Sequence, residues 1–447
     1  MRAGRWTLGI CLTLLWQTPA MAQDTARMDQ VMQYYLGEKL FMGSVLVVKD
    51  DKVLLDKGYG SANLEWNIAA TPATKFRLGS LTKQFTAAAI LLLEERGRLK
   101  LDDPIGKFVP DAPAAWDKVT LFNLLTHTAG VPNYTSFADF KAAMRRTVTP
   151  AELIATFRDK PLDFAAGTKW SYSNSNYILL GAVIEKTSGM PYAQFLQENL
   201  FTPLGMMDTG YDSAAQIIPM RASGYVRRKG ALLNDDFIDM STPYAAGSLY
   251  STTHDLLTWE KALYGGKLLK PGSLKKMTTP FKEEYAFGLG VHDDAGHLRF
   301  SHNGGINGFS TSLAWYPKEH LAVVVLDNVV SGNADLMMTK LADLALGRPV
   351  ILPSERKEIA VDAGLLDRYA GRYQFERGEV MTIVRDGDHL FSQVDNQSKI
   401  EMFAEAGGDF FTRAVDSQVR FVMPGYGPPS ALVLHRSGPD ITAKRLP

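Results

Sequence analysis

The sequence contains almost no cysteine: Cys11 is the single one in 447 residues. After residue 11 the chain therefore has no disulfide framework, no cysteine-liganded zinc and no thiol nucleophile. An excess of either charge is also absent, with 48 Lys+Arg against 48 Asp+Glu and no dense basic tract. Because phosphate backbones bind to basic faces, we expect no nucleic-acid partner.

Long hydrophobic runs are missing as well. The apolar stretch 6–16 is eleven residues long, whereas a membrane-spanning helix needs about 20. Two arginines precede this stretch, and Ala20 and Ala22 supply small residues after it, which is the pattern of a secretory signal peptide. We expect a signal peptide at 1–22, export to the periplasm or the medium, and no stable membrane anchor.

Two familiar hydrolase signatures do not occur. There is no Gly-x-Ser-x-Gly pentapeptide, which an α/β-hydrolase needs for its nucleophile, and no His-Glu-x-x-His for a metallohydrolase. The eight histidines are scattered, so His127 and His254 are interpreted as structural or capping residues, and we expect neither a metal nor an organic cofactor.

What is present is typical of a folded enzyme. Hydrophobic residues make up 46% and charged residues 21% of the chain, close to the globular average. Alternating and helical patterns predict an antiparallel sheet with helices at both ends of the segment 24–350 and a helical lobe inserted over 100–220. The expected helices are 28–40, 80–96, 177–186 and 334–346, and the expected strands are 43–48, 53–55, 300–302, 309–315 and 321–326.

The composition changes after residue 347. A linker rich in proline and charge is followed by seven or eight short alternating runs, which predict a small antiparallel barrel or sandwich over 351–447. We expect this region to shape substrate access without supplying a catalytic group. A domain that only stabilises the enzyme is the alternative, with its aromatic residues serving as core: Phe410, Phe411, Phe421 and Tyr426.

The first candidate for chemistry is Ser80-Leu81-Thr82-Lys83. On a helix this spacing places a hydroxyl and an amine on one face, so the amine can take the hydroxyl proton. The same spacing occurs at Ser273…Lys276 and Ser354…Lys357, but Ser80 alone opens an apolar helix, where burial would lower the pKa of Lys83. A capping serine with a solvated lysine is the other interpretation.

Two further segments join this pair. Tyr172-Ser173-Asn174 precedes a helix and offers a phenol for proton transfer and an amide for a substrate carbonyl, although a capping cluster would look similar. We expect a nearby ammonium to depress the pKa of the Tyr172 phenol below its usual value of about 10. His302-Asn303-Gly304-Gly305 follows a strand, and its glycines would let a substrate lie close to the backbone, although a glycine-rich hairpin would also fit.

Together, Ser-x-x-Lys, Tyr-x-Asn and a strand-borne His-x-Gly resemble the active-site set of penicillin-recognising serine hydrolases, in the branch of class C β-lactamases, D-aminopeptidases and family VIII esterases. Longer stretches over residues 41–330 carry the same resemblance: 119–130, 167–174, 246–252 and 287–290.

The resemblance implies roles for the residues. Ser80 is the nucleophile, Lys83 and Tyr172 share the proton transfers, and Gly305 joins Ser80 in binding the oxyanion. Asn174 and His302 orient the substrate and the leaving group, and Gly304 leaves room for the substrate. A lysine usually stands where His302 does, and a neutral histidine cannot grip a carboxylate, so esters and amides are expected to be better substrates than penicillins.

We thus predict an α+β fold, an α/β sandwich of the β-lactamase/transpeptidase type with an additional C-terminal β-barrel. The expected domains are a hydrolase domain over 23–350 and, by likeness to some D-aminopeptidases, a lipocalin-like β-domain over 351–447. The expected activity is serine hydrolysis of peptides, amides or esters, with a small molecule or a peptide, peptidoglycan-derived peptides included, as partner. A β-lactamase, or a penicillin-binding protein or sensor that acylates with little turnover, is the alternative.

Overall fold

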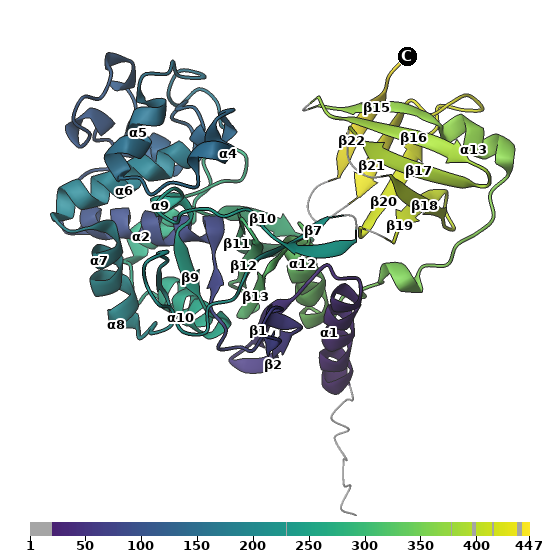
Figure 1. The fold of residues 1–447 in the computed structure, drawn as a ribbon, viewed down its shortest axis with the longest axis horizontal. Helices are drawn as coiled ribbons and strands as arrows, with labels where there is room; N and C mark the ends of the chain where they lie inside the picture. The colour runs from purple at the N-terminus through teal and green to yellow at the C-terminus, as the bar shows by residue number, and fades with distance from the viewer. Residues whose placement is uncertain (1–19, 229, 377, 396–398, 414, 436–439) are drawn as a thin grey trace, which may run out of the picture.

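The computed structural model describes residues 20–228, 230–376, 378–395, 399–413, 415–435 and 440–447. Figure 1 shows a helical lobe, a central sheet with helices on its faces, and a C-terminal barrel. The predicted fold class is therefore confirmed. The proposed signal peptide lies mostly outside the described residues. Within the described ranges, no helix has the length and hydropathy of a transmembrane span.

The central sheet is antiparallel and mixes the two ends of the catalytic region. Its six strands run in the order β10 (Gly290–Asp294), β11 (His297–Ile306), β12 (Phe309–Tyr316), β13 (Leu321–Asp327), β1 (Gly43–Lys49) and β2 (Lys52–Tyr59). Because β1 pairs with β13, the N-terminal hairpin completes a sheet whose other strands come from the segment 290–327. The strands predicted by alternation are all present.

Helices cover both faces of this sheet. Side chains of a strand point alternately to its two faces. Val45 and Val47 accordingly pack with α1 (Ala20–Gly37) and α12 (Ala334–Ala345), whereas Leu46 belongs to the core that includes α2 (Thr82–Glu95). Helix α1 begins earlier and ends sooner than the predicted 28–40.

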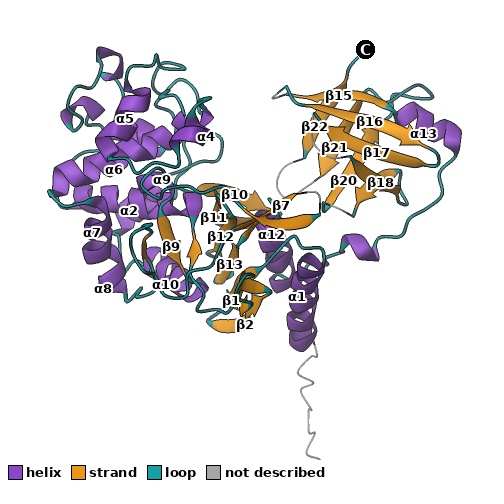
Figure 2. Ribbon diagram, in the orientation of Figure 1, coloured by secondary structure: helices purple, strands orange, loops and turns teal. Residues whose placement is uncertain are grey.

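The lobe is almost entirely helical, as Figure 2 shows. Its helices, with those that join it to the sheet, are α3 (Leu121–Leu125), α4 (Phe140–Ala143), α5 (Pro150–Arg158), α6 (Asn174–Ser188), α7 (Tyr192–Leu196), α8 (Thr202–Leu204), α9 (Tyr244–Gly247), α10 (Thr253–Tyr264) and α11 (Pro271–Met277). Short strands connect these parts: β3 (Ser61–Asn63), β4 (Ile68–Ala69), β5 (Phe76–Arg77), β6 (Gly210–Tyr211), β7 (Tyr225–Arg228), β8 (Ala231–Asn234), β9 (Leu249–Ser251) and β14 (Val329–Val330).

The C-terminal strands close into a barrel after helix α13 (Ala363–Tyr369). They are β15 (Gly371–Phe375), β16 (Val380–Asp386), β17 (His389–Val394), β18 (Ile400–Ala404), β19 (Asp409–Thr412), β20 (Ser417–Val422), β21 (Ala431–His435) and β22 (Ile441–Arg445). Phe410, Phe411 and Phe421 are buried, as expected of core residues. Tyr426 is not: it lies in the β20–β21 loop and is 99% exposed.

The barrel contacts the rest of the chain on one side of the sheet. Asp416, between β19 and β20, accepts a hydrogen bond of 2.8 Å from the Tyr35 hydroxyl of α1 and lies 3.0 Å from the Lys340 ammonium of α12. Only 8% of the Asp416 side chain is exposed, so this contact is sheltered from water. It lies on the α1 and α12 face, opposite the face that carries α2.

Candidate active site

Ser80 lies in a short 3-10 turn, Gly79–Leu81, that leads directly into the buried helix α2. Gly79 adopts a φ of +55°, and a β-carbon there would lie 3.0 Å from the Gly305 nitrogen of β11. A glycine is therefore needed for the turn to approach the strand this closely. This approach brings the Ser80 hydroxyl to the edge of the sheet.

Lys83 lies one turn further along the same helical segment and is completely buried. Its Nζ is 2.9 Å from each of three oxygens: Ser80 Oγ, Asn174 Oδ1 and the Ala246 carbonyl. No carboxylate pairs with it in these contacts, and burial lowers the pKa of Lys83 well below its ordinary value. Burial therefore favours the neutral amine form of Lys83, as the apolar helix predicted.

The neutral amine has one way to satisfy these three contacts. The carbonyl oxygens of Asn174 and Ala246 can only accept hydrogen bonds, so they take the two amine hydrogens. The lone pair of Nζ is then left for the Ser80 hydroxyl, whose proton it can receive. The geometry thus orients Lys83 as a base toward Ser80.

Tyr172 approaches Ser80 from the other side. Its hydroxyl donates a hydrogen bond of 2.8 Å to Ser80 Oγ. The sequence interpretation that a neighbouring ammonium would depress the pKa of this phenol is wrong in direction, because burial raises the pKa of Tyr172. Tyr172 is accordingly a neutral phenol, which can donate a proton, beside a neutral amine, which can accept one.

Asn174 is the first residue of α6 and lies beside this pair. Its Oδ1 accepts from Lys83, and its Nδ2 donates to Thr135 Oγ1 at 3.2 Å. The side chain is therefore held on both ends by the protein. These contacts do not test the predicted role of Asn174 in substrate binding. They do give Asn174 a second role, which is to orient Lys83.

His302 lies on β11 and is turned into the protein. Its Nδ1 is 2.6 Å from the Asn303 carbonyl, and its Nε2 is 3.0 Å from the Tyr285 hydroxyl. A carbonyl cannot donate, so Nδ1 carries the hydrogen and Nε2 accepts from Tyr285. Burial lowers the pKa of His302 to about 3, which leaves the ring neutral. A carboxylate grip by this residue is excluded by both observations.

The two glycines after His302 do different things. A β-carbon on Gly304 would lie 1.9 Å from the Leu78 carbonyl oxygen, so this glycine makes room for the segment that carries Ser80 rather than for a substrate. A β-carbon on Gly305 would meet nothing within 4 Å. In the ladder that starts from the Ile306–Phe309 pair, the N–H of Gly305 points away from β12 and toward the Ser80 turn. The oxyanion role that the resemblance implied for Gly305 stays a prediction.

Two cavities flank the pair formed by Ser80 and Tyr172. One, of about 200 Å³, contains Ser80, Asn174 and Gly305 and is lined otherwise mainly by apolar and small groups, Phe140 and Ile238 among them. The other, of about 400 Å³, begins at Tyr172 and His302. Larger cavities lie elsewhere, one of about 530 Å³ by Phe281, and do not reach Ser80.

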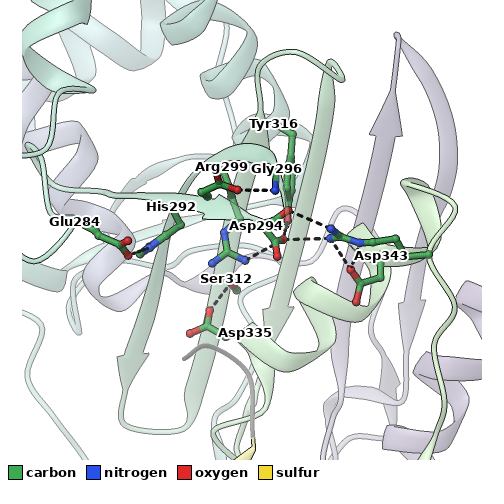
Figure 3. A network of polar contacts seen from close by, with 11 residues as sticks. Glu284, His292, Asp294, Gly296, Arg299, Ser312, Tyr316, Asp335 and Asp343 are labelled. Carbon is green, nitrogen blue, oxygen red and sulfur yellow. Dashed lines mark hydrogen bonds and ion pairs between the residues drawn. The ribbon is translucent and has the colours of Figure 1, made fainter. Parts of the chain in front are cut away.

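The second cavity has a charged wall. His292 Nδ1 lies 2.8 Å from Glu284, and Ser312 donates to Asp335 at 2.6 Å (Figure 3). Arg299 also lines the cavity and lies 3.7 Å from Asp294. The space beyond Tyr172 is therefore polar, whereas the space around Ser80 is largely apolar. Across the described part of the chain, no group of three His, Cys, Asp or Glu residues is placed to bind a metal.

Three contacts of the site were not foreseen. Tyr285 binds His302, the Ala246 carbonyl accepts from Lys83, and Thr135 accepts from Asn174. The stretch 246–252 had been noticed only for its resemblance to the family. A backbone carbonyl leaves no signature in a sequence, and Tyr285 is one of 17 tyrosines, so only the fold could identify them.

Comparison with known proteins agrees with this geometry. The Beta-lactamase family model matches residues 28–347, and a domain of unknown function (DUF3471) matches residues 355–446. The chain is 28% identical to Penicillin-binding protein 4* of Bacillus subtilis (strain 168), over 95% of this chain and all of that protein.

Two solved structures are similar as well. The octameric penicillin-binding protein homologue from Pyrococcus abyssi is 26% identical, with a TM-score of 0.68, over 94% of this chain and all of that one. A D-stereospecific amidohydrolase from Streptomyces is 26% identical, with a TM-score of 0.61, over 70% of this chain and 97% of that one. Since the family model covers the whole span from the N-terminal hairpin to α12 and includes every residue of the site, the chain belongs to the beta-lactamase family, as its motifs predict.

Proposed function

We propose that the protein is a serine hydrolase that cleaves amide, peptide or ester bonds through an acyl-enzyme on Ser80. One observation carries this proposal. Ser80 Oγ lies 2.9 Å from a buried amine and 2.8 Å from a half-buried phenol, whose pKa values are shifted in opposite directions. Paired groups with such opposed shifts are typical of acid–base catalysis.

The acylation step uses both groups. The Ser80 proton moves to the Lys83 amine as Oγ attacks the substrate carbonyl, and the negative oxygen that forms binds the N–H groups of Ser80 and Gly305. Tyr172 gives its proton to the leaving nitrogen or oxygen as the bond to the carbonyl carbon breaks. The proton on Lys83 then returns to the Tyr172 phenolate, so both groups are restored and the acyl group remains on Ser80.

Deacylation reverses these roles. A water molecule takes the place of the leaving group. It gives a proton to a basic group of the site as it attacks the acyl carbonyl, and that proton is passed to Ser80 Oγ when the acyl group is released. General acid–base assistance of this kind contributes about 10² to 10⁴ in rate. None of these steps requires a cofactor.

The two cavities support an orientation of the substrate. The acyl group lies in the apolar cavity because that cavity contains Ser80 and Gly305, and the leaving group lies beyond Tyr172, its proton donor. With His302 neutral and turned inward, substrates that lack a free carboxylate at that point are favoured. D-amino-acid amides, short peptides and esters fit these requirements. The name of the similar D-stereospecific amidohydrolase is consistent with such substrates.

A second function has some support. The Bacillus relative is named a penicillin-binding protein, so a β-lactamase, or a binding protein or sensor that acylates with little turnover, is the alternative. Burst kinetics separate these possibilities. One equivalent of product followed by no further release indicates a sensor, and continued release indicates a hydrolase.

The experiment uses the purified protein with a fluorophosphonate probe and with three substrate classes: p-nitrophenyl esters, D-aminoacyl amides and nitrocefin. We expect one adduct by intact mass, lost in Ser80→Ala, and steady turnover of an ester or an amide. Ser273→Ala is the matched control, because Ser273 has the same spacing to Lys276 but that lysine pairs with Glu94 at 2.8 Å. An adduct that survives Ser80→Ala contradicts the proposal.

A further inference from the structure

His127 lies in the loop after α3 and is completely buried beneath the candidate site. It adopts a φ of +54°, a backbone conformation that few residues other than glycine and asparagine accept readily. In the sequence it was interpreted as a structural or capping residue. Its contacts give it a more specific place.

His127 holds the backbone on both sides of Tyr172. Its carbonyl oxygen accepts a hydrogen bond of 3.0 Å from the N–H of Ser171. Its Nδ1 accepts one of 3.3 Å from the N–H of Ser173. The imidazole also lies against the Tyr172 ring, with the two ring centroids 4.4 Å apart. The residue therefore contacts Tyr172 and both of its neighbours.

These contacts determine the tautomer of His127. A backbone N–H cannot lose its hydrogen, so Nδ1 is an acceptor, and it also receives Asn176 Nδ2 at 3.2 Å. The ring hydrogen is then on Nε2, which is buried and has no hydrogen-bond partner among the described residues. The imidazole is packed among aromatic rings, including those of Tyr285 and Tyr177, whose centroids lie 4.9 Å and 5.2 Å from its own.

We infer that His127 is the positioning residue for Tyr172. Its contacts with the neighbouring backbone and with the ring hold the phenol where its hydroxyl reaches Ser80 and the departing group. This inference rests on the proposed function, in which Tyr172 protonates the leaving group. His127 is not itself a proton carrier. Its Nδ1 accepts from the backbone N–H of Ser173, which cannot become an acceptor, and its Nε2 has no hydrogen-bond partner among the described residues to which a proton could move.

The inference makes a prediction about leaving groups. Two acetate esters with the same acyl group form the same acyl-enzyme, so their kcat/KM values differ only in acylation. Phenol, the parent of the tyrosine side chain, has a pKa of about 10, so phenoxide leaves more slowly than p-nitrophenoxide and gains more from protonation. p-Nitrophenol is far more acidic and needs little assistance. Misplacing Tyr172 should therefore slow phenyl acetate much more than p-nitrophenyl acetate.

Two variants separate the acceptor from the ring. His127→Phe keeps an aromatic ring but removes the acceptor, and we expect it to raise the ratio of p-nitrophenyl acetate to phenyl acetate kcat/KM by about tenfold or more, within the range of general acid catalysis. His127→Asn tolerates the same φ and offers Oδ1 where Nδ1 was, so it should return the ratio to within about threefold of the wild type. His254→Phe is the matched control, since this histidine is exposed and pairs with Asp56 at 2.8 Å.

The outcomes are distinct. If both esters slow by the same factor in His127→Phe, the residue is merely structural and the inference is overturned. If that variant does not fold, His127→Leu, which also lacks an acceptor and is no larger than phenylalanine, carries the same expectation. If the wild type neither reacts with the phosphonate at Ser80 nor hydrolyses either ester, the proposed function fails instead.

Discussion

Lys83 and His302 are two buried basic side chains in the same site, and they differ in where their lone pairs point. Burial lowers the pKa of both. The Lys83 amine donates hydrogen bonds to Asn174 Oδ1 and the Ala246 carbonyl, and its lone pair points toward Ser80. His302 has one nitrogen on the Asn303 carbonyl and the other on Tyr285. Burial alone therefore does not make a base, because the partners of each nitrogen decide what it can do.

The difference also separates two kinds of substrate contact. A strand-borne lysine in place of His302 would be a cation beside the leaving group, whereas His302 is a neutral part of an aromatic wall with Tyr285 and Tyr172. Lys83 does not replace this charge where burial, which lowers its pKa, favours the neutral amine. In the function proposed above, the bond is then cleaved without a fixed cation next to Ser80.

The largest effect is expected from removing the Lys83 amine. Lys83→Met keeps the length of the side chain but has no base for Ser80, and we expect ester kcat/KM to fall by about 10³ or more, since a nucleophile and its base act as a unit. The free energy of unfolding should change little, because removing a buried ionisable group is favourable, whereas Asn174 Oδ1 and the Ala246 carbonyl lose their hydrogen-bond donor. Steady-state ester hydrolysis and urea denaturation measure the two effects.

Lys261→Met provides the control for Lys83→Met, because the Lys261 ammonium is on the surface and lies 2.5 Å from Asp51. Activity in Lys83→Met that equals that of Lys261→Met would show that Ser80 is activated by another group.

A smaller effect is expected from replacing His302 on β11 by a lysine, which carries the cation that this position lacks. His302→Lys can place an ammonium between the Asn303 carbonyl and the Tyr285 hydroxyl, near a substrate carboxylate. We expect the ratio of nitrocefin to ester acylation rates to rise by about tenfold, the typical size of one charge-assisted hydrogen bond. Stopped-flow acylation measures it. Wild-type nitrocefin hydrolysis at an ordinary kcat of about 10 s⁻¹ would refute the underlying argument.

The pH dependence of stability sharpens the comparison further. The pKa of His302 is about 3 in the folded protein and about 6.5 when unfolded. Between these values the unfolded state binds more protons, so the contribution of neutral His302 is present above about pH 6.5 and is lost as the pH falls toward 3. His302→Gln should therefore cost less stability at pH 4.5 than at pH 7.5, by about 3 kcal/mol.

Urea denaturation of the wild type and the variant at both pH values measures this difference. His254→Gln, on the surface, serves as the control. An equal loss of stability at both pH values in His302→Gln would mean that the ring is not held neutral.

The smallest effect on the site is expected from removing the barrel. Asp416 contacts Tyr35 and Lys340 on the α1 and α12 face, away from Ser80, so truncation after Leu352 should leave small-ester kcat/KM within about twofold of the full chain. Circular dichroism establishes that the shortened protein folds, and a longer peptide substrate tests whether the barrel shapes access. Loss of small-ester activity in a folded truncation would show that the barrel supplies part of the chemistry.

Much of the site could be inferred from local patterns. Ser80 and Lys83 are three residues apart on an apolar helix, so their proximity and the burial of the amine follow from helix geometry alone. The oxyanion role of Gly305 came from the family resemblance and stays a prediction. Gly304 was misjudged, because the Leu78 carbonyl that occupies the space beside it comes from a distant segment.

The protonation of the site could not be inferred in the same way. The pKa of Tyr172 is expected from the sequence to fall because of a neighbouring ammonium, and it rises because the phenol is partly desolvated. The tautomers of His127 and His302 depend on backbone groups that the sequence does not single out.

The sequence by itself determined the family, the sheet with its lobe and barrel, and the chemical groups available at Ser80, because these depend on patterns of spacing and hydrophobicity that lie along the chain. Only the tertiary structure decided which of those groups are charged, which nitrogen carries each proton and which partners turn Lys83 outward to Ser80 and His302 inward to Tyr285. The physical reason is that burial and hydrogen-bond direction arise from segments far apart in sequence, such as Ala246 and Asn174 meeting at one amine.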